Sequence, residues 1–314
     1  MGLLCFDAMN IITTIIPIFS IIILGWFARQ RGFIPSEFLE HANRLVYYIA
    51  IPAMIFRSIS SASLKTELDI RVVVICLFSL FVLFVFALAA GKIMRIPVKT
   101  YGSFVQCSFH GNLGYIGLAV SYYFLGQAGF VKAGILAGFI MIAQNFLAVT
   151  VLQLYSETDS KKKKAAIFKV LGNPIILSAA AGMLFSSAQI PVPVILGRSL
   201  DILTGMALPL ALLIIGASLS FDLMQLNIFP VLITGIIKLI LLPGTGFAIY
   251  KIFNLGINDY LPGLILLASP TATISFVMAK EMHGDSDFAV AAISTSTILS
   301  ALTFSVWLKI AAYF

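Results

Sequence analysis

The spacing of the charged residues constrains this chain more than any other feature of its sequence. Stretches of 20 to 28 residues without Asp, Glu, Lys or Arg recur along it, at 8–28, 72–91, 133–156, 170–197, 202–221, 260–279 and 288–308. A helix that crosses a hydrocarbon core of about 30 Å needs about 20 largely apolar residues. The strands of an outer-membrane barrel are shorter and alternate in polarity. The sequence therefore predicts an all-α membrane protein that crosses the bilayer many times.

Composition supports the same class and excludes others. The chain is 60% hydrophobic and 11% charged, with a net charge of +7, whereas soluble domains are about 25% charged. Basic residues of a membrane protein gather in its cytoplasmic loops, so the positive charge indicates no nucleic-acid partner. The three cysteines show no CxxC spacing, which argues against a disulfide framework or a metal site. Membrane lipid is the expected surrounding, and no cofactor is expected.

The predicted organisation is ten helices in two halves. Residues 1–155 form the first five-helix half, 156–166 a hydrophilic linker containing Lys161 to Lys164, and 167–314 the second half. With the linker on the cytoplasmic side, twelve Lys and Arg residues fall on that side and six on the other. This bias predicts a cytoplasmic linker and both termini outside. The predicted helices are 8–28, 45–64, 71–94, 101–125, 128–154, 167–188, 194–219, 226–253, 259–280 and 287–312.

The two halves share a nearly constant sequence offset. Pro17 and Pro52 precede Pro174 and Pro209 by 157 residues, and Gly126 precedes Gly284 by 158. Because each half has an odd number of helices, the second half enters the membrane from the opposite face. An inverted repeat of this kind is common among secondary transporters.

Two predicted helices are interrupted at matching positions. Residues 110–117 of the fourth helix read HGNLGYIG, residues 268–273 of the ninth read ASPTAT, and the offset takes Asn112 to Pro270. Glycine weakens a helix and proline frees a carbonyl. Close packing is the alternative reading, but paired breaks are typical of a transporter's binding site. The predicted substrate-binding residues of these segments are His110, Gly111, Asn112, Leu113, Gly114, Pro270, Thr271, Ala272 and Thr273.

Charged residues inside predicted spans extend this site. Arg57 lies in helix two and Lys238 near the middle of helix eight, with no Asp or Glu at a similar depth. Intramembrane charge is costly and usually functional, so both are predicted to bind an anionic substrate; for Arg57, snorkelling to the outer interface is the alternative. His110 is expected to bind substrate or a proton, or to bond a neighbouring helix. Gln144 and Asn145 are expected to hydrogen-bond between helices.

Taken in order, four segments resemble the auxin efflux carrier family over nearly the whole chain. They are Asn112 to Gly117, Asn173-Pro174, Leu208 to Leu219 and the region of Pro270. The resemblance implies a fold similar to that of bile acid–sodium symporters, with broken helices four and nine crossing at the midplane. It also implies an organic anion as substrate, such as auxin in plants or malate and malonate in bacteria. The chain departs from the family at Ala119, where proline is common, and before Trp307, which leaves the substrate less defined.

The leading hypothesis is a carrier that works by alternating access, and not an enzyme. An ion channel would favour rings of like charge or a repeated filter segment, and neither is visible. An intramembrane hydrolase would need a nucleophile beside a base, and His110 is the only histidine deep in a predicted span. A proton or a sodium ion as coupling ion, and a homodimer as assembly, are left open by the sequence. The substrate and the direction of transport are left open as well.

Overall fold

The structure is a computed structural model that describes residues 8–61, 67, 69–155, 174–224 and 228–313. Helices account for nearly all of these residues, which form no strand. The all-helical fold predicted from the sequence is thus confirmed for the described part of the chain. The predicted linker at 156–166, with Lys161 to Lys164, lies outside it.

Several helices are long enough to cross a membrane. Within the described ranges, six helical runs are long and apolar enough: Asn10–Gln30, Ile70–Ile93, Leu113–Leu154, Val194–Ala217, Ile228–Ile252 and Ser286–Tyr313. Pro174–Ser187 and Ile257–Ala268 are shorter apolar helices. In chain order the elements are α1 (Ala8–Gln30), α2 (Ser36–Leu45), η1 (Val46–Ala50), α3 (Ile51–Ser60), α5 (Ile70–Ile93), α6 (Val98–Phe109), η2 (Leu113–Gly117), α7 (Leu118–Leu154), α9 (Pro174–Ser187), α10 (Val194–Ala217), α11 (Phe221–Met224), α12 (Ile228–Ile236), η3 (Ile237–Leu241), α13 (Leu242–Ile252), α14 (Ile257–Ala268), α15 (Ile274–Glu281) and α16 (Ser286–Tyr313).

Helix α5 shows most directly that the outer surface suits lipid. Its N-cap residue Asp69 accepts a hydrogen bond from the backbone N–H of Arg71, which satisfies one free donor of the first turn. Beyond this cap, one face of the helix exposes large apolar side chains at helical spacing. They are Ile70, Val74, Phe78, Phe81 and Val85, each about half exposed. Water would disfavour such a stripe, whereas hydrocarbon accommodates it.

The run α7 contains two helices rather than one. Gly126 has φ 68° and ψ −165°, and these angles interrupt the helix. A positive φ is easy for glycine and strained for other residues. The interruption separates 118–125 from 127–154, close to the boundary predicted between the fourth and fifth helices. The apolar run Leu113–Leu154 is therefore divided at Gly126 into separate helical segments.

The second predicted helix begins earlier than the sequence indicated. The expected start was residue 45, but α2, η1 and α3 form one continuous helix from Ser36 to Ser60. The early part carries Glu37, Glu40 and Arg44, with only Ala42 buried. Apolar spacing identifies the segment inside hydrocarbon, and it cannot detect a polar extension that lies beyond it.

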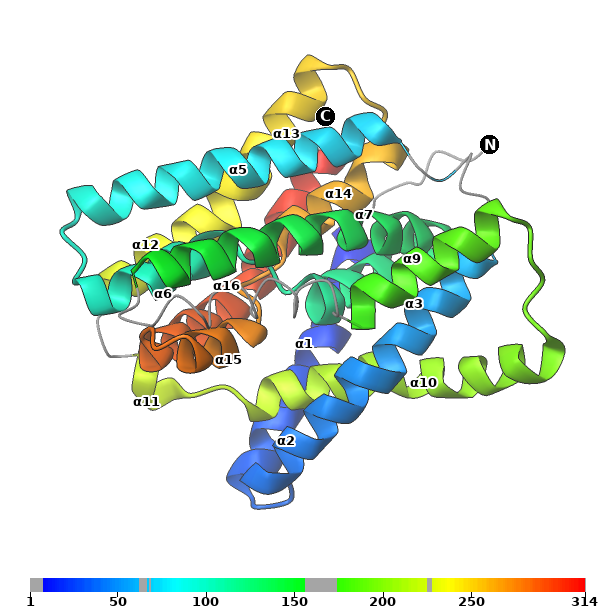
Figure 1. The fold of residues 1–314 in the computed structure, drawn as a ribbon, viewed down its shortest axis with the longest axis horizontal. Coiled ribbons are helices and arrows are strands. Elements are labelled where there is room, and N and C mark those ends of the chain that lie inside the picture. The colour runs from blue at the N-terminus through cyan, green and yellow to red at the C-terminus, as the bar shows by residue number, and fades with distance from the viewer. Residues whose placement is uncertain (1–7, 62–66, 68, 156–173, 225–227, 314) are drawn as a thin grey trace.

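The two halves of the chain interlock (Figure 1). Helix α1 packs on α10, α3 on α9, α5 on α13 and α7 on α14, so each of these pairs joins one half to the other. Helices α1 and α10 approach most closely where glycines face backbone. Gly25 faces the backbone of Leu213, and Gly216 faces the carbonyl of Ile22. Small residues that let helix backbones approach are a common feature of helix packing in membranes.

Candidate functional site

The first helix break lies between α6 and η2. Helix α6 ends at Phe109, and His110 turns the chain out of the helix with φ −75° and ψ 100°. Asn112 follows with φ −78° and ψ 66°, and η2 then begins as a π-helix. The interruption falls on the segment that the sequence identified. Residues 102–121 are buried without exception, so the exposed backbone groups must find partners inside the protein.

The second break lies between α14 and α15. Helix α14 ends at Ala268, where Ser269 adopts extended angles of φ −60° and ψ 144°. Pro270 follows and has no backbone N–H to continue a helix. Helix α15 begins again at Ile274. The ninth predicted helix is therefore also interrupted, over 269–273.

The two breaks bind each other through their backbones. Gly111 and Thr271 form an isolated antiparallel bridge. Asn112 N donates to Pro270 O at 2.7 Å, and Ala272 N donates to His110 O at 2.9 Å. Each break thus supplies the hydrogen-bond partner that the other lacks.

Neighbouring helices satisfy the remaining backbone groups of the crossing. Gln144 of α7 accepts from Gly111 N and donates to Gly111 O, both at 3.1 Å. Ser296 of α16 accepts from Thr271 N at 3.1 Å, and the Thr271 hydroxyl donates to Cys107 O at 3.0 Å. The N–H of Gly111 is therefore occupied by Gln144 in this structure. Gln144 bonds between helices as expected, whereas Asn145 donates to Met141 O within its own helix.

Replacing Gln144 by leucine should test the importance of this support. The change leaves the buried N–H of Gly111 without a partner, and its carbonyl keeps only the N–H of Leu113, which should cost about 1 to 3 kcal/mol of unfolding free energy. Thermal unfolding in detergent should then show a clearly lower midpoint. Phe146→Leu, at an exposed position of the same helix, should leave the midpoint nearly unchanged. Equal midpoints for the two variants would contradict this role for Gln144.

Lys238 lies beside the crossing and is completely buried. Its Nζ donates to Leu267 O, near the end of α14, at 2.8 Å. A methyl group on Gly111 would lie 3.3 Å from Lys238 Cε, so this side chain reaches both breaks. Among the described residues the ion pairs are Arg57–Asp201, Arg71–Asp69 and Lys132–Asp259, and Lys238 has no acidic partner. An ammonium has three donors, and only one of them meets an acceptor in the described part of the chain.

Two other polar groups of the first break also lack partners. His110 Nδ1 and Asn112 Nδ2 are buried and meet no hydrogen-bond partner within the described residues. Buried polar atoms are nearly always paired, so such exceptions call for an explanation. A ligand bound between the two breaks would supply the missing partners. These atoms, with Lys238 Nζ, form the donor set of the candidate site.

The other predicted residues of the two breaks have mainly packing positions. Leu113 is buried, and a methyl group on Gly114 would lie 3.2 Å from Ile175 of α9. Ala272 is buried and contributes its N–H to the pairing of the breaks. Thr273 occupies the N-cap position of α15 without a side-chain cap hydrogen bond. Its hydroxyl therefore remains a candidate ligand contact.

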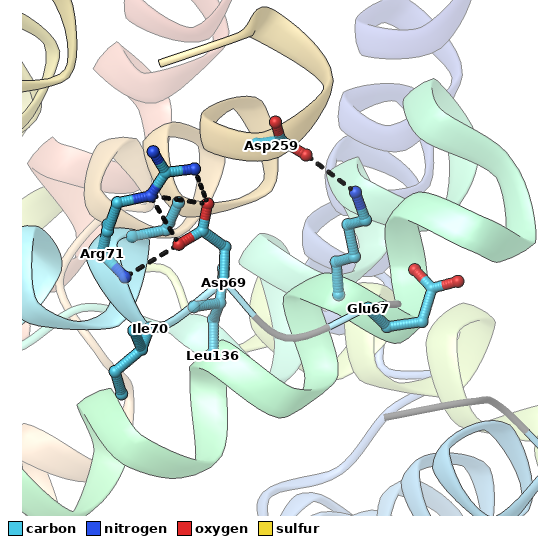
Figure 2. Close-up of a pocket in the computed structure, with 8 residues that line it drawn as sticks. Glu67, Asp69, Ile70, Arg71, Leu136 and Asp259 are labelled. Atoms are coloured by element: carbon cyan, nitrogen blue, oxygen red, sulfur yellow. Dashed lines mark hydrogen bonds and ion pairs between the residues drawn. The ribbon is translucent and has the colours of Figure 1, made fainter. Parts of the chain in front are cut away.

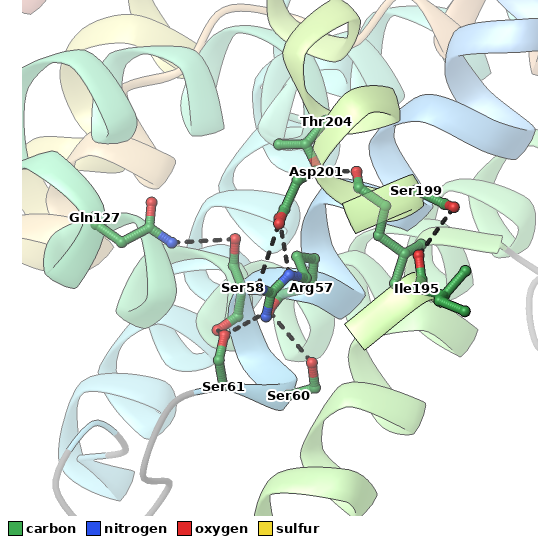
Figure 3. Close-up of polar contacts among 10 residues, drawn as sticks. Arg57, Ser58, Ser60, Ser61, Gln127, Ile195, Ser199, Asp201 and Thr204 are labelled. Atoms are coloured by element: carbon green, nitrogen blue, oxygen red, sulfur yellow. Dashed lines mark hydrogen bonds and ion pairs between the residues drawn. The ribbon is translucent and has the colours of Figure 1, made fainter. Parts of the chain in front are cut away.

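The structure does not bring Arg57 to the crossing. Its guanidinium pairs with Asp201 of α10, with Nε 2.8 Å from Oδ1 (Figure 3). The Arg57 side chain is 32% exposed and that of Asp201 is 54% exposed. Ser60 and Ser61 donate to the Arg57 carbonyl from the same helix end. Arg57 therefore joins α3 to α10 near the surface, and its charge is neutralised locally.

A charged cavity lies away from the crossing, at the ends of α5 and α14 (Figure 2). It has a volume of about 320 Å³ and is lined by Glu67, Asp69, Ile70, Arg71, Val72, Lys132, Leu136 and Asp259. The Arg71 side chain, hydrogen-bonded to Asp69, holds the pKa of that carboxyl below its usual value. Lys132 Nζ lies 3.3 Å from Asp259 Oδ1. Most charged side chains of this cavity are therefore paired with one another, whereas Lys238 at the crossing has no acidic partner among the described residues.

Lipid-facing helices around two paired helix breaks define a membrane transporter. Comparison with known proteins agrees, because the model of the family described as membrane transport protein matches residues 10–308. The chain belongs to this family, the auxin efflux carrier family that its motifs resemble.

Three relatives cover nearly the full length of the chain. A protein of Rhizobium meliloti named "Putative malonate transporter" is 28% identical over 304 residues, which are 92% of each chain. An uncharacterized transporter of Methanocaldococcus jannaschii is 24% identical over 93% of this chain and 96% of its own. An uncharacterized transporter of Methanothermobacter thermautotrophicus is 25% identical, and the match covers 94% of this chain and 96% of that protein. The chain is thus similar throughout to proteins named as transporters.

Proposed function

We propose that this protein is a secondary transporter that carries a small organic anion across the cytoplasmic membrane by alternating access. The observation that carries the proposal is Lys238, a fully buried lysine beside two helix breaks with no acidic partner among the described residues. A carboxylate is the ligand that such a group favours, because charge-assisted hydrogen bonds are the strongest polar contacts in a dry site.

The remaining donors of the crossing suit the same ligand. Asn112 Nδ2 can donate to a carboxylate oxygen, and His110 Nδ1 can do so when it carries the proton. Both atoms are buried without a partner in the described part of the chain. Unpaired buried donors of this kind match the acceptor-only character of a carboxylate.

The proposed architecture is ten helices in two inverted repeats, with the linker in the cytoplasm and both termini outside. Helix lengths support the repeat. Val98–Phe109 and Ile257–Ala268 have 12 residues each and lie at an offset of 159, since 257 − 98 and 268 − 109 are both 159. The helical stretch 127–154 and Ser286–Tyr313 share the same offset at both ends. In this proposal, Lys238 and the crossing form the site about which the repeats move.

The substrate class is supported by the relative named for malonate, at 28% identity. A dicarboxylate of this size would present one carboxylate to Lys238 and leave the second for Asn112 or His110. The transporter names of the relatives do not favour an ion channel or an intramembrane hydrolase.

Anion exchange in proteoliposomes tests the proposal. Vesicles loaded with unlabelled malonate should take up radiolabelled malonate, and other small carboxylates should compete according to their fit. Asn112→Ala should reduce this exchange about 10-fold through the loss of one buried hydrogen bond to a charged group. Asn258→Ala, at an exposed position of α14, should exchange at the wild-type rate. Absence of exchange for every small carboxylate tried would refute the proposed function.

A further inference from the structure

We propose that Lys238 carries a proton as a second transported species, so that one proton crosses with each anion in the same direction. This inference rests on the proposed function. Its starting point is the missing counter-charge, because within the described residues Lys238 Nζ hydrogen-bonds to a neutral backbone carbonyl, that of Leu267, and to no carboxylate. A buried ammonium without a negative partner is several kcal/mol less stable than a paired one.

The helices packed around Lys238 supply no such partner among the described residues. Lys238 lies in η3, which packs against α5, α6, α14 and α16. His110, the residue that follows α6, is titratable but provides no negative charge in either of its ordinary protonation states. Cys76 of α5 and Tyr250 of α13 bond each other at 2.9 Å. The remaining ionisable side chains on these elements and on α13 are Arg71, Lys92, Lys99, Tyr101, Cys107, Lys251, Asp259, Tyr260, Asp287, Lys309 and Tyr313.

The acidic members of that set lie at helix ends. Asp259 is in the first turn of α14 and Asp287 is in the first turn of α16, whereas Lys238 lies in the middle of the run from Ile228 to Ile252. Asp259 is also paired with Lys132. The site therefore changes charge by gaining or losing a proton, or by gaining an anion.

Binding of a proton to Lys238 and binding of an anion beside it favour each other. In the empty carrier the neutral amine is the stable form, since it still donates to the Leu267 carbonyl and carries no unpaired charge. A carboxylate that enters the site is stable only beside the ammonium form. The anion and a proton from the same aqueous side therefore bind together, with the proton on the Nζ lone pair. When the anion leaves on the other side, the unpaired ammonium releases its proton to that side.

Proton-driven accumulation is the decisive measurement. Wild-type proteoliposomes, with the membrane potential clamped at zero by potassium and valinomycin, should concentrate radiolabelled malonate against its gradient when the outside is more acidic. A difference of one pH unit should support about tenfold accumulation at one proton per anion. A trapped pH dye should report one proton entering for each malonate.

Substitution separates the proton role from anion binding. Lys238→Arg keeps a permanent charge, so whatever malonate exchange this variant shows should carry no proton and should not respond to a pH difference. Lys251→Met, a change to a lysine on α13 away from the site, should retain both. Exchange without any proton entry in the wild type would overturn the proton role and leave the proposed function intact, whereas no exchange would refute both. If the arginine variant does not elute as a folded protein, the proton stoichiometry of the wild type decides alone.

Discussion

Replacing Lys238 by methionine should reduce malonate exchange by about 100-fold or more. Removing one member of a buried, hydrogen-bonded charge pair costs about 2 to 5 kcal/mol, and each 1.4 kcal/mol is a factor of ten. Lys238 Nζ is the one fully buried side-chain ammonium of the described residues. Initial exchange rates per reconstituted protein measure the effect directly.

The same substitution should not destabilise the protein. Methionine matches the length of lysine and adds no unpaired charge, so the melting temperature in detergent should stay the same or rise. Lost exchange with undiminished stability is the pattern of a binding residue. A variant that exchanges malonate at the wild-type rate would falsify the proposed role of Lys238, and a large fall in stability would instead indicate a structural one.

Replacing Gly216 by alanine should produce the largest effect on folding among the glycine variants of α10. The added methyl group would overlap the carbonyl oxygen of Ile22 on α1. Since two helix backbones cannot give way as a flexible side chain does, α1 and α10 must separate. Overpacking of this kind costs about 1 to 3 kcal/mol and occasionally more. We expect poor yield of folded protein and a strongly lowered melting temperature in detergent.

Gly205→Ala is the matched control on the same helix. A methyl group there meets nothing within 4 Å, and alanine favours a helix by up to about 1 kcal/mol over glycine. Its melting temperature should equal or exceed that of the wild type. Gly25→Ala, which meets the backbone of Leu213 from the opposite helix, should resemble Gly216→Ala. Equal melting temperatures for Gly205→Ala and Gly216→Ala would show that the close contact of α1 with α10 does not determine the stability of the fold.

The sequence predicted the breaks because their cause is local. Glycine and asparagine at 111–114 and proline at 270 weaken a helix wherever they occur in it. Lys238 could be singled out for a similar reason, since a lone charge in an apolar run is visible without any knowledge of its neighbours. The residues that define the proposed site were therefore mostly identifiable in advance.

The partners of these residues could not be predicted, because they depend on how distant helices pack. Arg57 looked like a free intramembrane cation until the fold placed Asp201 2.8 Å away, although 144 residues separate them in the chain. Gln144 was expected to bond another helix, but not to hold both backbone groups of Gly111. A pattern within one segment carries no information on which segment will lie beside it.

The hydrogen bonds between the two breaks determine where this protein can bend. Asn112 with Pro270 and Ala272 with His110 tie the four half-helices into one rigid body, so a large rotation at the breaks would sacrifice two buried backbone bonds at once. Motion must instead be absorbed where that body meets its surroundings by single side chains. Tyr115, whose hydroxyl donates to Asn43 of α2 at 2.6 Å, makes such a contact, and a change of rotamer in either side chain would break it.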